Sequence, residues 1–284
     1  MATLTRRVLL AALPAACMAI PPAARAFDAP PESHRVLLRD VTVDGRAYRL
    51  FMAEPVGVPP ASGWPSLWML DGNAVFERLT AEDLRHHPRL AVVGIGYPGS
   101  ESFDTTARAL DYTPTSPPDT ETARGRMTGG ADAFRARLTG PLRRAAAERV
   151  ALDPARCMLW GHSYGGLFTL HCLMSEPLAF SGWIAASPSS GFGGGVLRGL
   201  AATAPHLPPE RVAPVRILLG DSEHRRGSPP PGGPRPNPET LALAEVLERR
   251  ADLEVRLTVL KGLGHGATFA ASFPQALELA EAAG

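Results

Sequence analysis

Ser163 stands in a five-residue pattern, Gly161-His162-Ser163-Tyr164-Gly165, that is typical of a nucleophilic serine. A mostly apolar run, 156–160, precedes the pattern, and a helix-like run, 167–174, follows it at once. A strand, a sharp turn and a helix are the setting in which such a serine is exposed on a tight turn. The helix behind the turn also offers free N–H groups to a developing oxyanion. The pattern therefore predicts a serine nucleophile at a strand-to-helix elbow.

A serine hydroxyl is a weak nucleophile until a base takes its proton. His265 is the best-placed base, because it lies in a glycine-rich turn, 262–266, between the last predicted strand and the last helix. His162 is next to the nucleophile but on the opposite side of the turn, and we assign it a structural role. The acid that would orient the base stays open between Asp221 and Glu223, which follow the strand ending at 220. Glu223 is favoured because it has more freedom to reach His265.

An oxyanion hole needs two converging N–H groups. The residue after the nucleophile, Tyr164, supplies the first. The second is expected from the loop after the strand that ends at Leu70, where Asp71-Gly72-Asn73 stands, and we predict the N–H of Asn73. An ordinary turn is the alternative interpretation of that tripeptide.

Continuous apolar runs separated by helical segments predict an α/β chain with a mostly parallel sheet covered on both faces. Two early antiparallel strands, 35–39 and 48–52, flank an Asp44-Gly45 turn. The later strands are expected at 66–70, 90–97, 156–160, 181–188, 215–220 and 253–260, and the helices at 74–87, 131–150, 167–174, 240–250 and 267–283. Residues 98–130 and 227–238 are expected to be loops, since both are rich in proline and lack apolar periodicity.

The composition limits which kinds of protein and which partners the chain can represent. The chain has 284 residues, of which 45% are hydrophobic, and its 29 basic and 28 acidic side chains nearly balance. This balance indicates no nucleic-acid partner, and no group of Cys and His has metal-ligand spacing, so neither a metal nor a cofactor is predicted. Cys157 and Cys172 are expected to be two buried thiols, because they flank the elbow on opposite sides of a layer. The sequence carries no signal for an oligomeric state.

The first 26 residues are typical of an export signal. Thr5-Arg6-Arg7 precedes an uncharged run, 8–24, and Ala24-Arg25-Ala26 fits a cleavage site. The arginine pair resembles a twin-arginine signal, so we expect a periplasmic protein with one domain over 27–284. An uncleaved membrane anchor is the alternative, although the apolar run is short and contains three prolines.

Several longer stretches resemble the Putative esterase (esterase D-like) family of α/β hydrolases, and within it the periplasmic esterases of trilactone siderophores. The matching stretches are Met69-Leu-Asp-Gly-Asn-Ala-Val75, Gly96-Tyr97, Arg108-Ala-Leu-Asp-Tyr-Thr-Pro114, Gly129-Gly130, Trp160-Gly-His-Ser-Tyr-Gly-Gly-Leu-Phe168, Ala186-Ser-Pro-Ser189, Leu263-Gly-His-Gly266 and Phe269-Ala-Ala-Ser-Phe273. The resemblance implies an α/β-hydrolase fold, with Ser163 as nucleophile and His265 as base. It also implies that a serine–histidine dyad can suffice without Glu223.

The resemblance implies that Arg108 lies near the site and positions an anionic catecholate substrate or a catalytic group; a loop arginine paired with Asp111 is the alternative. The leading hypothesis is thus a serine esterase acting through an acyl-enzyme on a small-molecule ester, a trilactone catecholate siderophore in ferric or iron-free form. A general carboxylesterase or acyltransferase of the same family is the second hypothesis. A siderophore-binding module without catalysis is the third, and the retention of both Ser163 and His265 argues against it.

Overall fold

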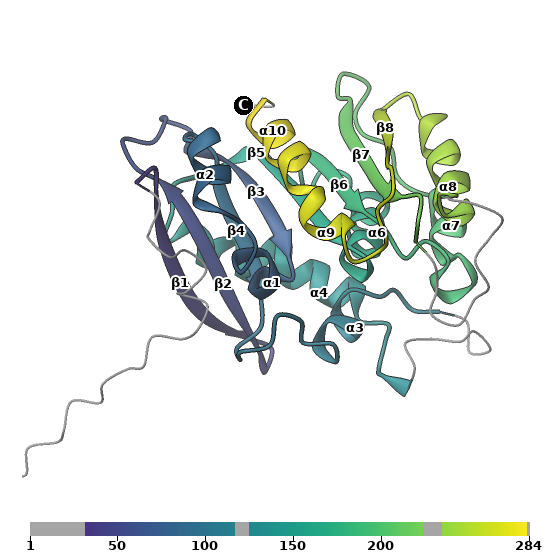
Figure 1. Cartoon of the computed structure of the whole chain (residues 1–284), viewed down its shortest axis with the longest axis horizontal. Coiled ribbons are helices and arrows are strands. Elements are labelled where there is room, and N and C mark those ends of the chain that lie inside the picture. The colour runs from purple at the N-terminus through teal and green to yellow at the C-terminus, as the bar shows by residue number, and fades with distance from the viewer. Residues whose placement is uncertain (1–31, 117–124, 224–234, 283–284) are drawn as a thin grey trace, which may run out of the picture.

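Eight strands form one sheet in this computed structural model, which describes residues 32–116, 125–223 and 235–282. The strand order is β1-β2-β4-β3-β5-β6-β7-β8, and all neighbours from β4 to β8 are parallel, whereas β2 is antiparallel to both β1 and β4. The bounds are β1 His34–Val43, β2 Arg46–Pro55, β3 Trp64–Leu70, β4 Ala91–Gly96, β5 Leu152–His162, β6 Gly182–Ala186, β7 Ala213–Gly220 and β8 Leu253–Leu260 (Figure 1). The mostly parallel sheet and the early antiparallel pair are therefore confirmed. The predicted export signal, 1–26, and its membrane-anchor alternative lie outside the described residues, as does most of the predicted loop 227–238.

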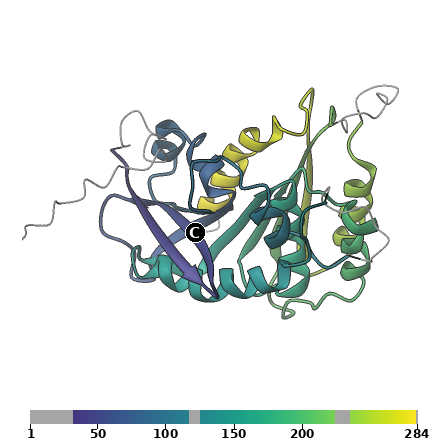
Figure 2. The same cartoon turned by 90° about the horizontal axis from the view of Figure 1, so that it is seen from below.

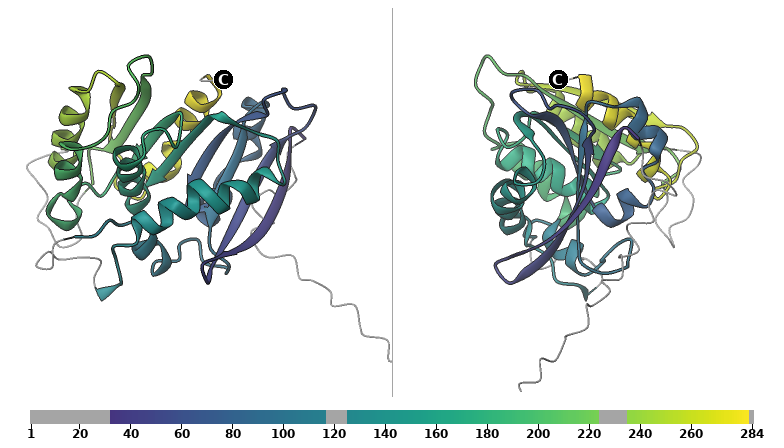
Figure 3. Two further views of the ribbon diagram at one scale, coloured as in Figure 1. Left: turned by 180° about the vertical axis from the view of Figure 1, so that it is seen from behind. Right: turned by 90° about the vertical axis from the view of Figure 1, so that its left-hand side faces the viewer.

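Helices cover both faces of the sheet, which Figure 2 shows from below and Figure 3 from behind and from one side. The reason is visible in β3, whose successive side chains enter two different hydrophobic clusters: Leu67 and Met69 belong to one, Trp68 and Leu70 to the other. The cluster of Leu67 packs under α1, α2, α9 and α10, and that of Trp68 under α4, α6, α7 and α8. Their bounds are α1 Gly72–Phe76, α2 Ala81–His86, α3 Ala107–Asp111, α4 Ala131–Arg137, α5 Arg143–Ala147, α6 Tyr164–Ser175, α7 Val196–Ala201, α8 Pro238–Glu248, α9 Thr268–Ala271 and α10 Phe273–Ala282.

Three helices that the sequence predicts as continuous are interrupted. The helix predicted over 74–87 is divided into α1 and α2, and Thr80 begins the second with a reciprocal capping box to Asp83. The helix predicted over 131–150 contains a π-helical turn, Leu138–Leu142, around Pro141, whose ring cannot continue regular α-helical bonding. The closing helix is divided between α9 and α10, just before Pro274. Within the predicted loop 98–130, the structure adds the short helix α3, which carries Arg108.

Cys157 and Cys172 are free and buried, as predicted. Burial raises the pKa of both thiols, so neither is a reactive thiolate. No helix in the described ranges is long and apolar enough to cross a membrane. Likewise, across the described part of the chain, no three His, Cys, Asp or Glu side chains are grouped to hold a metal ion.

A buried ion pair, Arg250–Asp252, lies in the connection between α8 and β8. Asp252, 8% exposed, accepts a 2.6 Å hydrogen bond from Arg250 Nη2 and a 2.8 Å bond from the N–H of Leu207. The hydrogen bonds from Arg250 hold the pKa of Asp252 well below its usual range, although burial would raise it. The carboxylate is therefore ionised in all but strongly acidic solution, and its removal would leave Arg250 buried without its partner.

We expect Asp252→Asn to lower the free energy of unfolding at pH 7 by about 3 kcal/mol, because one member of a buried pair is neutralised. Denaturant unfolding measures this, with Asp40→Asn as the control, since the exposed Asp40–Arg49 pair contributes less than about 1 kcal/mol. A carboxyl whose folded pKa is depressed contributes its stability above its unfolded pKa and loses it as the pH falls through the folded value. The difference between wild type and Asp252→Asn should therefore be constant from pH 7 to about pH 5 and shrink in more acidic solution. Equal stability of the two proteins at pH 7 would contradict the prediction.

Candidate active site

Ser163 lies at a strained turn between β5 and α6, as the elbow pattern predicts. Its φ of 60° and ψ of −115° are unusual for a residue other than glycine. The turn is so tight that a Cβ on Gly161 would lie 2.3 Å from the backbone of Gly165, which only a glycine avoids. Strain of this kind persists where surrounding structure holds it, and here it lifts the serine hydroxyl off the end of the sheet.

The structure brings Ser163, His265 and Glu223 into one line of hydrogen bonds. Nε2 of His265 lies 3.0 Å from Oγ of Ser163, and Nδ1 lies 3.1 Å from Oε2 of Glu223. The three residues come from the elbow, the turn after β8 and the turn after β7. Their order in the chain and their geometry are those of a nucleophile, a base and an orienting acid. The imidazole of His265 is 45% exposed, so the line is open to solvent on the side of the base.

Glu223, rather than Asp221, faces the base. Its Oε1 accepts hydrogen bonds from Oγ of Ser187 at 2.6 Å and from the N–H of Gly220 at 2.5 Å, which leaves Oε2 directed at His265. Burial raises the pKa of Glu223, but the hydrogen bonds from His265, Ser187 and Gly220 outweigh it and hold the pKa below its usual range. Asp221 instead accepts from the N–H of Gly262 at 2.7 Å and so supports the base-bearing turn.

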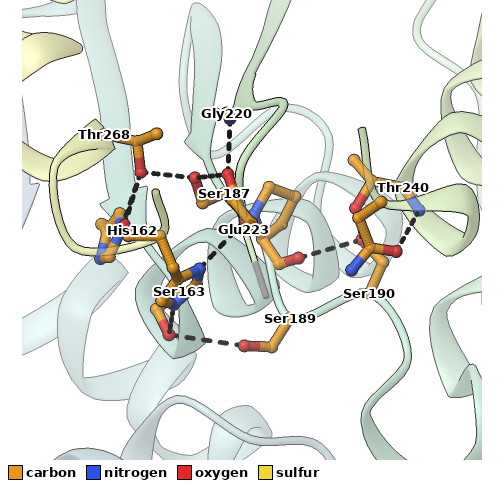
Figure 4. A network of polar contacts seen from close by, with 12 residues as sticks. His162, Ser163, Ser187, Ser189, Ser190, Gly220, Glu223, Thr240 and Thr268 are labelled. Carbon is orange, nitrogen blue, oxygen red and sulfur yellow. Dashed lines mark hydrogen bonds and ion pairs between the residues drawn. The ribbon is translucent and has the colours of Figure 1, made fainter. Parts of the chain in front are cut away.

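Sequence reasoning missed Ser187, which follows β6 and lies buried behind Glu223. Its φ of 42° is positive, and its hydroxyl donates to Glu223 while its oxygen contacts the hydroxyl oxygen of Thr268 (Figure 4). Two signals in the sequence could have found it: its place at the end of a buried strand, and the stretch Ala186-Ser-Pro-Ser189, which resembles the esterase family.

The two predicted oxyanion donors both lie at helix starts beside the elbow. Tyr164 is the first residue of α6, and Asn73 is the second residue of α1, so neither N–H has a partner within its own helix. A Cβ on Gly165 would lie 3.4 Å from Leu70, which places the loop after β3 against the first turn of α6. The side chain of Asn73 is engaged elsewhere: its amide group exchanges two hydrogen bonds with the backbone of Tyr97. Only the backbone of Asn73 is thus available for the predicted role.

Arg108 lies beside the elbow, and its partner is Asp71 rather than Asp111. Nε and Nη2 bind the two carboxylate oxygens of Asp71 at 2.8 and 2.9 Å, and Nη2 also donates to the carbonyl of His162 at 3.3 Å. The alternative of an Arg108–Asp111 pair is wrong, because buried Asp111 accepts from Arg46, Tyr48 and Tyr97 instead. Burial lowers the pKa of Arg108, but the Asp71 carboxylate outweighs it, so the guanidinium stays charged.

Helix α3 therefore holds the loop after β3 at two points. Arg108 donates two hydrogen bonds to the carboxylate of Asp71, and the hydroxyl of Tyr112 accepts a 3.2 Å hydrogen bond from the N–H of Asp71. Asp71 itself has a φ of 56°, in the left-handed region that residues other than glycine adopt uncommonly. Asp71, which joins β3 to α1, is thus braced next to the nucleophile, and Gly72 and Asn73 begin α1 directly after it.

Comparison with known proteins connects this geometry to a family. A profile of the family described as Putative esterase matches residues 43–275, which include the elbow, Glu223 and His265. The chain belongs to this esterase family. It is a carboxylic ester hydrolase with the α/β-hydrolase fold, as the sequence predicts.

Individual relatives of this esterase agree with the assignment. The apo-salmochelin esterase of Escherichia coli O6:H1 is 36% identical over 256 residues, which cover 83% of this chain and 76% of the relative. The ferri-bacillibactin esterase BesA of Bacillus subtilis is 34% identical over 160 residues, or 51% of this chain and 55% of the relative. A solved structure of the enterobactin hydrolase IroE in complex with DFP has a TM-score of 0.72 at 32% identity and covers 88% of this chain and 96% of that one.

Proposed function

We propose that this esterase hydrolyses the ester bonds of a trilactone catecholate siderophore, with Ser163 as nucleophile and His265 as base. The hydrogen bond between Oγ of Ser163 and Nε2 of His265 carries the mechanistic part of the proposal, since a base must be within reach of the proton it takes. The similarity to esterases named for salmochelin, bacillibactin and enterobactin supports the substrate class.

The reaction proceeds in two steps. Oγ of Ser163 attacks the ester carbonyl carbon while its proton moves to Nε2 of His265, and the N–H groups of Tyr164 and Asn73 stabilise the oxyanion. The tetrahedral intermediate then expels the alcohol, which takes the proton from His265, and leaves an acyl-enzyme. A water molecule, deprotonated by His265, attacks the acyl carbon; the carboxylic acid leaves and Ser163 regains its proton. Glu223 holds the imidazole in the tautomer with a proton on Nδ1.

A comparison of substrates tests the proposal. Iron-free and ferric trilactone siderophores are incubated with the protein beside p-nitrophenyl esters, and the linearised products are separated by chromatography. We expect kcat/KM for a trilactone to exceed that for p-nitrophenyl butyrate by at least about tenfold, because remote contacts with a preferred substrate stabilise its transition state. Hydrolysis of the simple esters alone would refute the siderophore substrate and leave a general carboxylesterase. Transfer of the acyl group to an added alcohol in preference to water would identify an acyltransferase.

We further propose that the protein works in the periplasm after cleavage of residues 1–26. The support is the twin-arginine pattern at Arg6-Arg7 and the small residues Ala24 and Ala26. Cell fractionation with sequencing of the mature N-terminus tests this, and a chain that starts at Phe27 is the expected result. Recovery of the full-length chain with the membranes would contradict it.

We propose that Arg108 acts by bracing the loop after β3 rather than by binding a substrate anion, because both oxygens of buried Asp71 depend on it. Arg108→Lys keeps the charge but loses the paired hydrogen bonds. We expect its kcat/KM to fall about 10- to 100-fold for both p-nitrophenyl butyrate and a catecholate ester, since a displaced oxyanion donor affects every substrate. Exposed Arg35→Lys is the control and should leave both values unchanged. A rise in KM confined to the anionic catecholate would show direct substrate binding instead.

A further inference from the structure

His162, the neighbour of the nucleophile, directs its side chain toward Phe269 and the turn that carries His265. The residue ends β5 and is 6% exposed. Its ring packs edge-on against Phe269, with centroids 5.3 Å apart, and lies 4.9 Å from the ring of His265. His162 therefore contacts the base-bearing part of the chain, although the two histidines are 103 positions apart in the sequence.

The imidazole of His162 binds the main chain of the base itself. Nε2 lies 2.8 Å from the carbonyl oxygen of His265 and 3.2 Å from Oγ1 of Thr268. A carbonyl oxygen only accepts, so Nε2 of His162 carries a proton and donates. The hydroxyl of Thr268 donates to the same carbonyl at 2.7 Å. Two donors from the buried side thus hold the backbone of an otherwise exposed histidine, and Figure 4 shows His162 and Thr268 together beside Ser163.

This anchoring is useful because of the turn that carries the base. Gly262, Gly264 and Gly266 alternate with the other residues around His265, so the local sequence does little to restrict its backbone. Burial and, to a smaller extent, the neighbouring His265 together lower the pKa of His162 to about 3. The ring stays neutral and places no positive charge beside the base.

We propose that His162 is a positioning residue, which aligns Nε2 of His265 with the hydroxyl of Ser163 by holding the His265 carbonyl. The proposal rests on the proposed roles of Ser163 and His265. A misplacement of about 1 Å in such a pair costs on the order of 100-fold in rate. The pattern Gly-His-Ser-x-Gly thereby places the nucleophile and the anchor of its base on consecutive residues.

Two substitutions separate this role from simple packing. His162→Phe keeps an aromatic ring against Phe269 but has no donor, whereas the side-chain amide of His162→Gln can still donate to the carbonyl. We expect His162→Phe to lower kcat for p-nitrophenyl butyrate by about 10- to 100-fold with KM changed less than about threefold, and to slow fluorophosphonate labelling in proportion. His162→Gln should recover kcat to within about fivefold of wild type. His86→Gln, an exposed histidine on α2, serves as the control.

Folding is checked for each variant by circular dichroism and its melting temperature. A folded His162→Phe with wild-type kcat would overturn the proposal, and so would equal losses in the Phe and Gln variants. Should His162→Phe fail to fold, Thr268→Val removes the other donor to the same carbonyl and should lower kcat at least about tenfold; a wild-type kcat there would also overturn it. Full activity in Ser163→Ala would refute the proposed nucleophile whatever the result at His162, so the two failures are distinguishable.

Discussion

We expect Ser163→Ala to lower kcat for ester hydrolysis by at least about 10⁴-fold and to abolish covalent labelling by a fluorophosphonate. The reason is that both steps of the reaction pass through Oγ, and removal of the nucleophile leaves only the binding contacts and the oxyanion donors. The substitution removes one partly exposed oxygen and leaves the backbone of the turn in place, so the fold and the affinity for substrate should survive. Steady-state kinetics and mass spectrometry of the labelled protein measure the two effects.

Ser189→Ala is the matched control for that experiment. Its Oγ lies 3.5 Å from Oγ of Ser163, so it shares the same environment, but it is the hydroxyl of Ser163 that donates to Nε2 of His265. We expect this variant to be labelled at Ser163 and to keep kcat within about tenfold of wild type. Labelling that persists in Ser163→Ala, or disappears only in Ser189→Ala, would show that the nucleophile is another residue.

The fold was predictable because its signals are local. The alternation of Leu67, Trp68, Met69 and Leu70 between two clusters needs no knowledge of the rest of the chain, and continuous apolar runs mark strands covered on both faces. Where the sequence prediction is wrong, local chemistry still explains the result. The capping box at Thr80 starts a second helix inside a run that apolar periodicity treats as one.

The side chains that hold the site residues in place were less predictable from the sequence, because they act through contacts between segments that are far apart in the chain. Arg108 and Asp71 are 37 positions apart, and nothing in the sequence distinguishes Asp71 from Asp111, which is three positions from the arginine. The choice depends on how α3 packs against the loop after β3. In the same way, sequence adjacency connects His162 to Ser163, whereas its side chain binds the turn that carries His265.

The identity of the acid that orients His265 can be tested directly, because the structure distinguishes two candidates that the sequence places close together. Asp221 and Glu223 are two positions apart and both follow β7, so the sequence alone left them, and a dyad without either, as alternatives. The structure separates them by their partners: Ser187 and the Gly220 N–H bind one oxygen of Glu223 and leave the other to His265, while Asp221 faces Gly262.

We expect Glu223→Gln to lower kcat by about 10²- to 10⁴-fold with little change in KM. The amide keeps the shape of the carboxylate but can donate to Nδ1 of His265, which favours the wrong tautomer and removes the charge that stabilises the imidazolium. Because the folded pKa of Glu223 is held below its usual range, the wild-type carboxylate stays ionised down to acidic pH. The loss relative to wild type should therefore be constant from about pH 6 to pH 9, rather than appearing only on one side of the profile.

Asp221→Asn provides the matched comparison, since it makes the same chemical change two positions away. Its amide oxygen can still accept from the N–H of Gly262, so we expect kcat within about threefold of wild type. A large loss in Glu223→Gln with none in Asp221→Asn establishes a triad whose acid follows β7. Equal, small effects in both variants would instead mean that Ser163 and His265 work as a dyad. The hydrogen bonds from Ser187 and Gly220 to Glu223 would then serve only to fix the turn after β7.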